Sequence, residues 1–300
     1  IHYVIKKNCI KKLINFDCLS YAANLDNMHG IEKNPKYALV KGNLKNFSHI
    51  FDAIYKNDIS HVVHLAAETH VDNSIMAPDA FIESNIVGTF NLLKVARDLN
   101  LKRLHHVSTD EVYGELKEKG KFKETTPYDP RNPYAASKAS ADFLVRSYVN
   151  TYSLPATISN CSNNYGPRQH KEKFIPTIIN SVLNGNKVPV YGEGLNVRDW
   201  IYVEDHCRAL WKILRKGEIG ETYNVGANHE KKNIDIVKTI CKVLNTSPKK
   251  CIEYVEDRAG HDFRYAIDNS KIKKELKWYP KHNFKKAIKK TIKWYKSECK

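Results

Sequence analysis

The sequence predicts an α/β fold, in which a parallel sheet carries helices on both faces and a smaller mixed α/β part follows. Over the first two-thirds of the chain, short β-branched runs alternate with longer helical patterns, which is the rhythm of βαβ units. After about residue 160 the pattern loosens into loops punctuated by Pro and Gly. We therefore expect one domain over 1–160 and a second over 161–300, with some segments of the second returning to the first.

The expected elements follow from apolar periodicity and from turn residues. Candidate strands are Leu13–Phe16, Tyr37–Lys41, His61–Ala66, Leu104–Ser108, Ala156–Ser159, Val188–Tyr191 and Tyr223–Val225. Candidate helices are Phe47–Lys56, Pro78–Asn100, Pro133–Tyr152, Lys173–Leu183, Val203–Lys216, Ile234–Leu244 and Phe284–Lys296. The helix over 78–100 places most of its apolar residues on one face, as packing against a sheet requires.

The first residues do not fit the start of such a domain. Ile1–Asn8 has the pattern of the second half of a helix that leads directly into the strand ending at Asp17. We therefore expect a doubly wound sheet whose first strand, with the glycine-rich turn after it, is absent from these 300 residues.

Composition narrows the function classes. The formal charge is +16, but 39 of the 49 basic residues are lysines, which favours a solvated lysine-rich surface over nucleic-acid recognition. No apolar run approaches the roughly 20 residues that cross a bilayer, and no leader is evident, so we expect no membrane partner and a cytoplasmic protein. The seven scattered cysteines form no CxxC pair, which favours reduced thiols and no metal site.

Tyr134 and Lys138 form the strongest chemical motif. Pro133 suits the first position of a helix, and a spacing of four places both side chains on one helical face. An ammonium there lowers the pKa of the phenol and can hold a cofactor ribose, so Tyr134 becomes a candidate base. Such a pair is common by chance, and its position after a predicted strand ending in Ser108–Thr109 strengthens the interpretation.

The end of that strand reads Val-Ser-Thr-Asp-Glu-Val-Tyr-Gly over 107–114. Ligands of open α/β sheets bind outside the carboxyl ends of the strands, so Thr109, Asp110 and Glu111 are expected in the cleft beside Tyr134. Two adjacent carboxyl groups there can divide acid and base roles. An ordinary acidic turn is the alternative.

These motifs, together with Ser-Asn-Asn-Tyr-Gly-Pro at 162–167 and Gly-Leu-Asn-Val-Arg-Asp-Trp-Ile-Tyr-Val-Glu-Asp-His at 194–206, resemble the dTDP-glucose 4,6-dehydratases. That family belongs to the extended short-chain dehydrogenase/reductases, and the resemblance covers essentially the whole chain. It implies a Rossmann-like NAD-binding domain, a role in nucleotide-sugar metabolism and biosynthesis of deoxysugars such as rhamnose, and a homodimer.

The resemblance also implies the catalytic roles. Tyr134 takes the proton of the C4 hydroxyl while hydride passes to NAD, Glu111 removes the C5 proton, and Asp110 protonates the departing C6 hydroxyl. Thr109 hydrogen-bonds the sugar, and Lys138 positions Tyr134 and the nicotinamide ribose.

For the cofactor, Asp17 at the end of the second sheet strand is expected to accept the adenosine ribose hydroxyls, which favours NAD over NADP. By resemblance, the other NAD residues are Ser20, Leu44, Leu65, Ala66, Ala67, Ser84, Tyr134, Lys138 and Asn164. The substrate residues are Thr69, Thr109, Asn163, Lys173, Phe174, Pro189, Tyr191, Arg198, Asn233, Arg258 and His261. Arginine suits a diphosphate because its planar fork offers paired donors, and Tyr191 can lie against a pyrimidine.

Departures from the family pattern leave alternatives open. The glycine-rich turn that would cradle the pyrophosphate is absent, so we expect the 300 residues by themselves to bind NAD weakly. Asn43 replaces the usual Asp beside the adenine, and Asn160 replaces a usual Arg. The leading hypothesis is conversion of dTDP-glucose to dTDP-4-keto-6-deoxyglucose. The alternatives are a dehydratase or epimerase acting on a UDP-sugar and an inactive nucleotide-sugar-binding protein.

Overall fold

The chain is described by a computed structural model that covers residues 1–257 and 261–298. It divides into two compact units. Unit 1 comprises Ile1–Val112, Pro130–Asn160 and Cys207–Tyr223, and unit 2 comprises Tyr113–Asp129, Cys161–His206 and Asn224–Lys300. Each unit has its own apolar core. The assignment of cofactor and nucleotide sugar to two parts of the chain stays a proposal.

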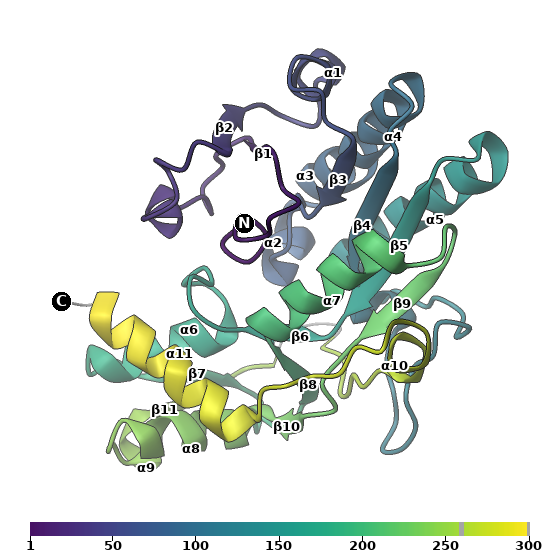
Figure 1. The fold of residues 1–300 in the computed structure, drawn as a ribbon. Helices are drawn as coiled ribbons and strands as arrows, with labels where there is room; N and C mark the ends of the chain where they lie inside the picture. Colours follow the sequence, from purple (N-terminus) through teal and green to yellow (C-terminus); the bar gives the residue numbers. More distant parts are fainter. Residues whose placement is uncertain (258–260, 299–300) are drawn as a thin grey trace. The chain divides into compact units, whose positions relative to one another are not determined.

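Unit 1 contains parallel strands with connecting helices (Figure 1). Its strands are β1 (Leu13–Asp17), β2 (Tyr37–Lys41), β3 (His61–His64), β4 (Arg103–Thr109), β5 (Ala156–Cys161) and β9 (Thr222–Val225), the last two extending into unit 2. Its main helices are α1 (Phe47–Tyr55), α2 (Val71–Met76), α3 (Asp79–Phe81), α4 (Gly88–Asp98), α5 (Pro133–Tyr152) and most of α7 (Val203–Lys216). Short 3-10 turns lie at η1 (Leu25–Met28) and η3 (Asp110–Tyr113).

Side chains of β4 show that helices cover both faces of this sheet. Leu104 joins a core cluster with residues of α1, α4 and α5, such as Leu93 and Val145. On the alternate face, Arg103 donates hydrogen bonds to the carbonyl oxygens of Ile213 and Gly217 at the end of α7. Because strand side chains alternate between faces, the predicted doubly covered parallel sheet is confirmed.

The strand order of unit 1 is interrupted. One sheet has the order β1-β2 and the other β3-β4-β5-β9. In the doubly wound order 3-2-1-4-5-6, β2 and β1 match positions 3 and 2, and β3, β4 and β5 match positions 4, 5 and 6, with β9 as a further strand beside β5. The central strand 1 has no counterpart among the described residues. All residues of β1 except exposed Asp17 are half-buried, whereas β4 is buried from Leu104 to Thr109.

Two predictions, for residues 1–8 and for the strand over 61–66, are corrected. Ile1–Asn8 is not the end of a regular helix but a series of turns, in which Ile5 N–H bonds the Ile1 carbonyl oxygen and Lys7 N–H bonds that of Val4. A helix this short gains too few hydrogen bonds to repay its nucleation. The strand predicted over 61–66 ends at His64, and Leu65 is 59% exposed because β3 has no neighbour on its outer edge among the described residues.

The predicted helix over 78–100 contains a π-helical segment, η2 (Ile82–Val87), between α3 and α4. By contrast, α5 matches its predicted bounds. Asn132 caps its start by accepting the Ala135 N–H at 2.8 Å, Pro133 occupies the first turn, and left-handed Ser153 ends it.

Unit 2 is a mixed α/β arrangement. Its strands are β6 (Asn163–Tyr165), β7 (Val188–Tyr191), β8 (Val197–Tyr202), β10 (Glu230–Lys232) and β11 (Ile252–Val255), in the orders β10-β8-β6 and β11-β7. Its helices are α6 (Phe174–Leu183), α8 (Asn233–Val243), α9 (Pro248–Cys251), α10 (Ser270–Leu276) and α11 (Phe284–Glu298).

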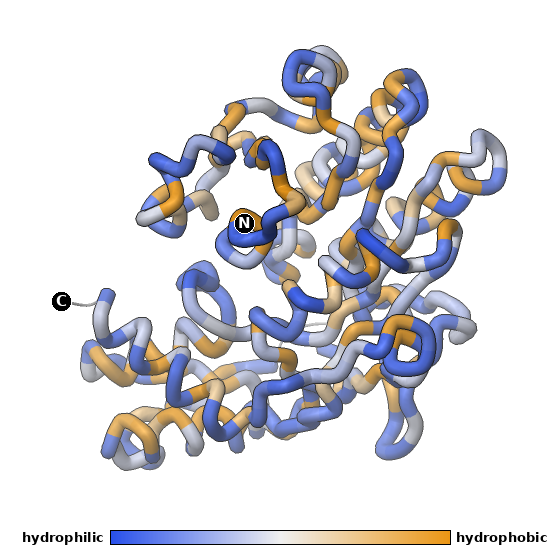
Figure 2. Tube along the Cα trace, viewed as in Figure 1, coloured by the Kyte–Doolittle hydropathy of each residue, from blue (hydrophilic) through white to orange (hydrophobic). Residues whose placement is uncertain are grey.

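The lysines of α11 lie on its solvent face. Phe284, Ala287, Ile288, Ile292 and Tyr295 are buried at helical spacing, whereas the lysines between them are exposed. Figure 2 shows the resulting alternation of apolar and polar residues along this helix. No helix of the described residues is long and apolar enough to span a membrane.

Three buried histidines make stability depend on pH. Burial lowers the pKa of His206 to about 4. Burial, with the nearby Lys138 ammonium and for His64 also His106, lowers the pKa values of His64 and His106 well below the ordinary value. The unfolded chain therefore binds more protons than the folded chain below a pH of about 6.5.

We predict that the free energy of unfolding falls as pH decreases from about 6.5 toward 4, since folding must keep these imidazoles neutral. Urea denaturation of a His206→Gln variant across this range should show a weaker dependence than wild type. His29→Gln, at a side chain that is 90% exposed, is the control and should leave the dependence unchanged. Parallel curves for wild type and His206→Gln would contradict the prediction.

We also predict that amides of β1 exchange with solvent deuterium faster than those of β4. A half-buried two-stranded pair opens more readily than a strand buried between neighbours on both sides. Peptide-resolved exchange mass spectrometry measures both. Equal protection of the two strands would show that β1 is held as firmly as a central strand, against the expectation.

Candidate active site

The carboxyl end of β4 presents the three residues predicted for catalysis. Thr109 and Asp110 are buried, and Glu111 is half-buried in the turn η3. The Thr109 hydroxyl oxygen accepts the Glu111 N–H at 3.3 Å, and the hydroxyl lies 3.4 Å from Asp110 Oδ1. The backbone therefore turns at the strand end and fixes two carboxyl groups next to each other.

Asn132 links this turn to the helix that carries Tyr134. Its Oδ1 accepts the Ala135 N–H, and its Nδ2 lies 3.5 Å from Glu111 Oε2. The amide that begins α5 therefore also contacts the carboxylate of Glu111. Through this contact the structure brings the start of the Tyr134 helix together with the acidic turn.

Tyr134 and Lys138 are both buried on α5. Lys138 Nζ donates a 2.9 Å hydrogen bond to the carbonyl oxygen of Val107 in β4. The Tyr134 ring packs edge-on against Phe81, with ring centroids 6.3 Å apart. The ammonium is therefore fixed to the strand that ends in Thr109, one helical turn from the phenol.

Asn85 supports this arrangement, although no sequence motif points to it. It is 1% exposed and lies in the π-helical segment. Its side chain accepts the Glu68 N–H and donates to the Glu68 carbonyl oxygen and to Ser137 Oγ. Ser137 Oγ in turn donates to the Tyr134 carbonyl oxygen at 2.7 Å. The sequence did contain a sign of this role, because Asn85 falls on the apolar face of the predicted 78–100 helix. A buried Asn is uncommon unless it is hydrogen-bonded.

The predicted cofactor residues of unit 1 are exposed or half-buried, apart from Tyr134 and Lys138. Asp17 is exposed at the carboxyl end of β1, and its Oδ1 accepts the Leu19 N–H at 2.7 Å. A carboxylate in that position suits a ribose diol. Ser20, Leu65 and Ala66 are exposed, and Leu44, Ala67 and Ser84 are half-buried. The glycine turn for the pyrophosphate is not part of the sequence.

Two other predicted site residues, Thr69 and Asn164, lie in different units. Thr69 is exposed in the segment between β3 and α2 of unit 1. Asn164 lies on β6 of unit 2, where its Nδ2 donates to the Ser162 carbonyl oxygen at 3.1 Å.

Unit 2 brings several predicted substrate residues into pairs. The Tyr191 ring meets the His261 ring edge-on at 6.1 Å, and His261 Nδ1 lies 2.5 Å from Asp257 Oδ1. The Phe174 ring stacks on Trp200 at 6.1 Å, and Asn163 pairs with Trp200 in the sheet. Lys173 precedes α6, Pro189 is exposed on β7, Asn233 begins α8, and Arg258 lies outside the described residues.

Arg198 is more enclosed than a surface ligand for diphosphate would be. It is 8% exposed, donates to the carbonyl oxygens of Val197, Asp262 and Phe263, and lies 4.3 Å from the Tyr265 ring centroid. These contacts hold the segment 262–265 to β8. The guanidinium therefore has a structural function here, and its contact with substrate stays a proposal.

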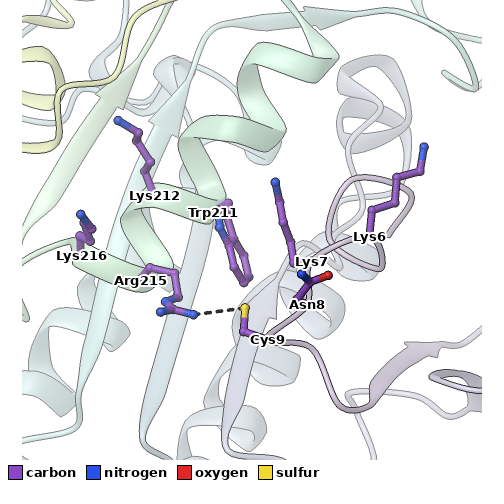
Figure 3. Close-up of a pocket in the computed structure, with 8 residues that line it drawn as sticks. All are labelled: Lys6, Lys7, Asn8, Cys9, Trp211, Lys212, Arg215 and Lys216. Carbon is purple, nitrogen blue, oxygen red and sulfur yellow. Dashed lines mark hydrogen bonds between the residues drawn. The ribbon is translucent and has the colours of Figure 1, made fainter.

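A cavity of about 650 Å³ elsewhere in unit 1 contains none of the predicted site residues (Figure 3). It is lined by Lys6, Lys7, Asn8, Cys9, Trp211, Lys212, Arg215 and Lys216. Figure 3 shows Lys6, Lys212 and Lys216 extending away from one another, while Arg215 donates to the Cys9 thiol at 3.4 Å. Because these cationic side chains do not converge on one point, they do not define a binding site for an anion.

Comparison with known proteins supports the constellation. The profile of the family described as GDP-mannose 4,6 dehydratase matches residues 1–291. A dTDP-glucose 4,6-dehydratase of Xanthomonas campestris pv. campestris is 47% identical over 92% of this chain and 84% of its own length. The enzyme of that name from Salmonella typhimurium is 46% identical over 97% of this chain and 87% of its own.

Solved structures agree. The dTDP-glucose 4,6-dehydratase DesIV from Streptomyces venezuelae, with NAD bound, superposes with a TM-score of 0.94 at 38% identity, over 99% of this chain and 90% of that one. The Bacillus anthracis dTDP-glucose 4,6-dehydratase in complex with NAD gives 0.91 at 44% identity, over 99% and 91%. A UDP-glucose 4-epimerase from Thermus thermophilus gives 0.88 at 27% identity, over 94% and 90%.

The resemblance inferred from the motifs is thereby confirmed. A family profile that spans nearly the whole chain, relatives with one shared name, and a matching fold all point to the same family. The chain belongs to the nucleotide-sugar 4,6-dehydratase family that the GDP-mannose 4,6 dehydratase profile describes.

Proposed function

We propose that this protein is an NAD-dependent hydro-lyase that converts dTDP-glucose to dTDP-4-keto-6-deoxyglucose. The observation that carries the proposal is the contact of Asn132 with both Glu111 and the first turn of the Tyr134 helix. It joins an acid–base turn to a Tyr–Lys pair within one compact unit. The relatives named dTDP-glucose 4,6-dehydratase support the choice of reaction.

The first step is assigned to Tyr134. Its phenolate takes the proton of the sugar's C4 hydroxyl, and Thr109 hydrogen-bonds the same region of the sugar. Lys138, fixed to the Val107 carbonyl oxygen, keeps a positive charge near the phenol and reaches the nicotinamide ribose. NAD, when bound, would supply reversible hydride transfer. In unit 1, Asp17, Leu44 and Ser84 would hold the cofactor.

The elimination step is assigned to the acidic turn. A keto group at C4 acidifies the hydrogen at C5, so the Glu111 carboxylate is a sufficient base for it. Asp110, buried beside Thr109, donates the proton to the C6 hydroxyl as it leaves as water. Two neighbouring carboxyl groups with different exposure suit opposite roles, because burial favours the protonated form.

The nucleotide part of the substrate is assigned to unit 2. Tyr191 can lie against the pyrimidine, and His261 and Lys173 offer cationic or hydrogen-bonding groups to the diphosphate. We further propose a homodimer, a cytoplasmic location and a place in deoxysugar biosynthesis such as that of rhamnose. These follow from the family resemblance.

An epimerase acting on a UDP-sugar is the second candidate, since the Thermus thermophilus UDP-glucose 4-epimerase shares the fold. Transient oxidation at C4 by a Tyr–Lys pair serves both reactions. The adjacent Asp110 and Glu111 favour dehydration, because only elimination across C5 and C6 needs a second acid and base.

We predict that Glu111→Gln binds dTDP-glucose with unchanged affinity but lowers turnover on the order of a hundredfold or more, since it removes the C5 base. Incubation in deuterated solvent, with mass spectrometry of the sugar, measures exchange at C5. Asp129→Asn, at an exposed carboxylate in another unit, is the control. Retained C5 exchange in Glu111→Gln would remove Glu111 from the base role.

We also predict that dTDP-glucose is turned over at least about tenfold faster than UDP-glucose, which corresponds to about 1.4 kcal/mol of discrimination. The assay is made on the 300 residues alone and on the same chain joined at Ile1 to the first strand and glycine turn of the Salmonella typhimurium relative. The joined chain should be the more active, because a glycine turn at a helix start binds the pyrophosphate. Absence of a 4-keto-6-deoxy product from the joined chain would refute the proposed function, and a preference for UDP-glucose would favour the second candidate.

A further inference from the structure

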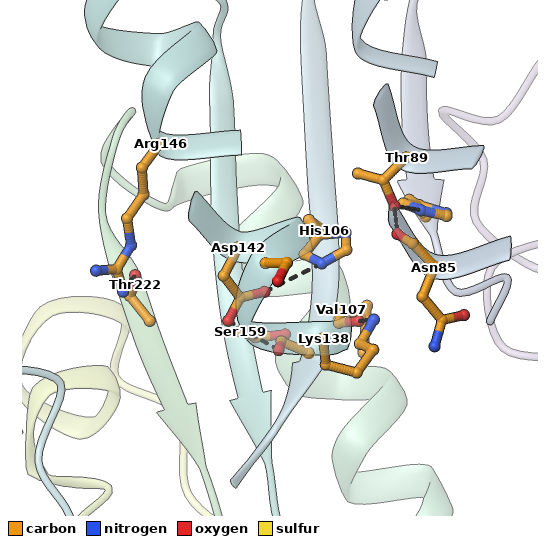
Figure 4. Close-up of polar contacts among 12 residues, drawn as sticks. Asn85, Thr89, His106, Val107, Lys138, Asp142, Arg146, Ser159 and Thr222 are labelled. Atoms are coloured by element: carbon orange, nitrogen blue, oxygen red, sulfur yellow. Dashed lines mark hydrogen bonds and ion pairs between the residues drawn. The ribbon is translucent and has the colours of Figure 1, made fainter. Parts of the chain in front are cut away.

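A buried polar cluster lies behind the Tyr–Lys pair, and the proposed mechanism does not use it. Tyr134, Lys138 and Asp142 follow one another at intervals of four on α5, so they share one helical face. Asp142 is fully buried. Figure 4 shows its carboxylate between α5 and β4, directed toward His106.

Asp142 contacts β4 through two residues. Ser108 Oγ donates to Asp142 Oδ2 at 2.9 Å, and His106 Nε2 lies 3.1 Å from Asp142 Oδ1. The His106 contact has an ion-pair distance without good hydrogen-bond alignment, so Ser108 supplies the better-defined bond. His106 and Ser108 alternate with Val107, whose carbonyl oxygen receives the Lys138 ammonium.

These contacts fix the register of the helix on the strand. Three consecutive residues of β4, 106–108, are held by two residues of α5 that lie one turn apart. Thr109 follows immediately on the strand, and Tyr134 lies one turn before Lys138 on the helix. A shift of α5 along β4 would break these bonds and move the phenol relative to Thr109, Asp110 and Glu111.

The charges are consistent with this arrangement. Burial and the Lys138 ammonium hold the pKa of His106 well below its ordinary value, so His106 faces Asp142 as a neutral ring at neutral pH. His64, whose pKa is lowered in the same way, hydrogen-bonds Thr89 at 3.0 Å. Arg146, one turn beyond Asp142, contacts Thr222 Oγ1 at 3.3 Å. On the helix, Asp142 lies one turn from the basic residue on either side of it, Lys138 and Arg146.

We propose that Asp142 is a positioning residue, which locks α5 onto β4 through Ser108 and His106 and thereby holds Tyr134 and Lys138 opposite Thr109, Asp110 and Glu111. The catalytic part of this inference rests on the proposed function, whereas the locking of helix to strand does not.

The test uses two variants and a matched control. Asp142→Asn keeps the shape but removes the charge, and Ser108→Ala removes only the bond to Asp142. Ser159→Ala is the control, because Ser159 Oγ makes an equally buried 3.0 Å contact with His105 Nε2 on the opposite face of β4. Loss of a buried hydrogen bond should lower the melting temperature of both serine variants by similar amounts.

The first readout is deuterium exchange of amides 133–142 in the full chain. Asp142→Asn and Ser108→Ala should speed exchange in this half of α5, and Ser159→Ala should not. The second, made on the joined chain with saturating NAD, is the single-turnover rate constant of nicotinamide reduction by dTDP-glucose, which should fall on the order of tenfold in the first two variants with the Kd of dTDP-glucose unchanged. A variant that is only less stable lowers the amplitude and leaves the rate constant unchanged. If Asp142→Asn proves too unstable, Ser108→Ala carries the comparison.

Equal exchange of α5 in Ser108→Ala and Ser159→Ala, or wild-type exchange in Ser108→Ala, would overturn the proposal. Faster exchange with an unchanged rate constant would overturn its catalytic part. A joined wild-type chain that shows no nicotinamide reduction would contradict the proposed function, and the exchange comparison would still decide whether Asp142 locks the helix.

Discussion

The attachment of α5 to β4 is the constraint on which the candidate site depends. A buried ammonium, a buried carboxylate and a serine hydroxyl connect the two elements, and the observed register gives each of the three groups a hydrogen bond between helix and strand. Buried polar groups are costly when they lack partners, so their bonds restrict how the helix can lie on the strand. Tyr134 and the Thr-Asp-Glu turn are brought together because each follows directly from one of these two elements.

A second network of buried polar groups also holds the start of α5 in place. Asn85, in a π-helical segment, bonds both the backbone of Glu68 and the hydroxyl of Ser137, which contacts the Tyr134 carbonyl oxygen. π-Helical insertions are often found at functional sites, because the extra residue displaces a side chain from the regular helical face. Here the Asn85 amide connects the segment after β3 to the start of α5. Both of these segments belong to the expected cofactor site.

The strand order of unit 1 is interrupted between β1 and β3. β1 and β3 each have one hydrogen-bonded neighbour among the described residues, and the apolar side chains near this interruption, Leu65 above all, are exposed. A parallel sheet is normally buried on both faces, and a central strand would supply that burial. The residues that would contact the ribose and nicotinamide of NAD are present, and the turn that would hold its pyrophosphate is absent from the sequence.

The sequence by itself determined the α/β class, most element bounds and the chemical motifs, because apolar periodicity, proline and cap residues act locally. It therefore predicted α5 at its observed bounds and both acidic residues at the end of β4. It missed the strands β6, β8, β10 and β11 and the helices α2, α9 and α10, and it treated η2 as regular helix, because short elements and π-helical insertions have little periodicity of their own. Only the tertiary structure decided that Asn132 contacts Glu111, that Asp142 reaches Ser108, and that Arg198 bonds main-chain carbonyl oxygens. These contacts join residues 21, 34 and 64 positions apart, and no local pattern specifies which buried polar groups at such separations satisfy one another.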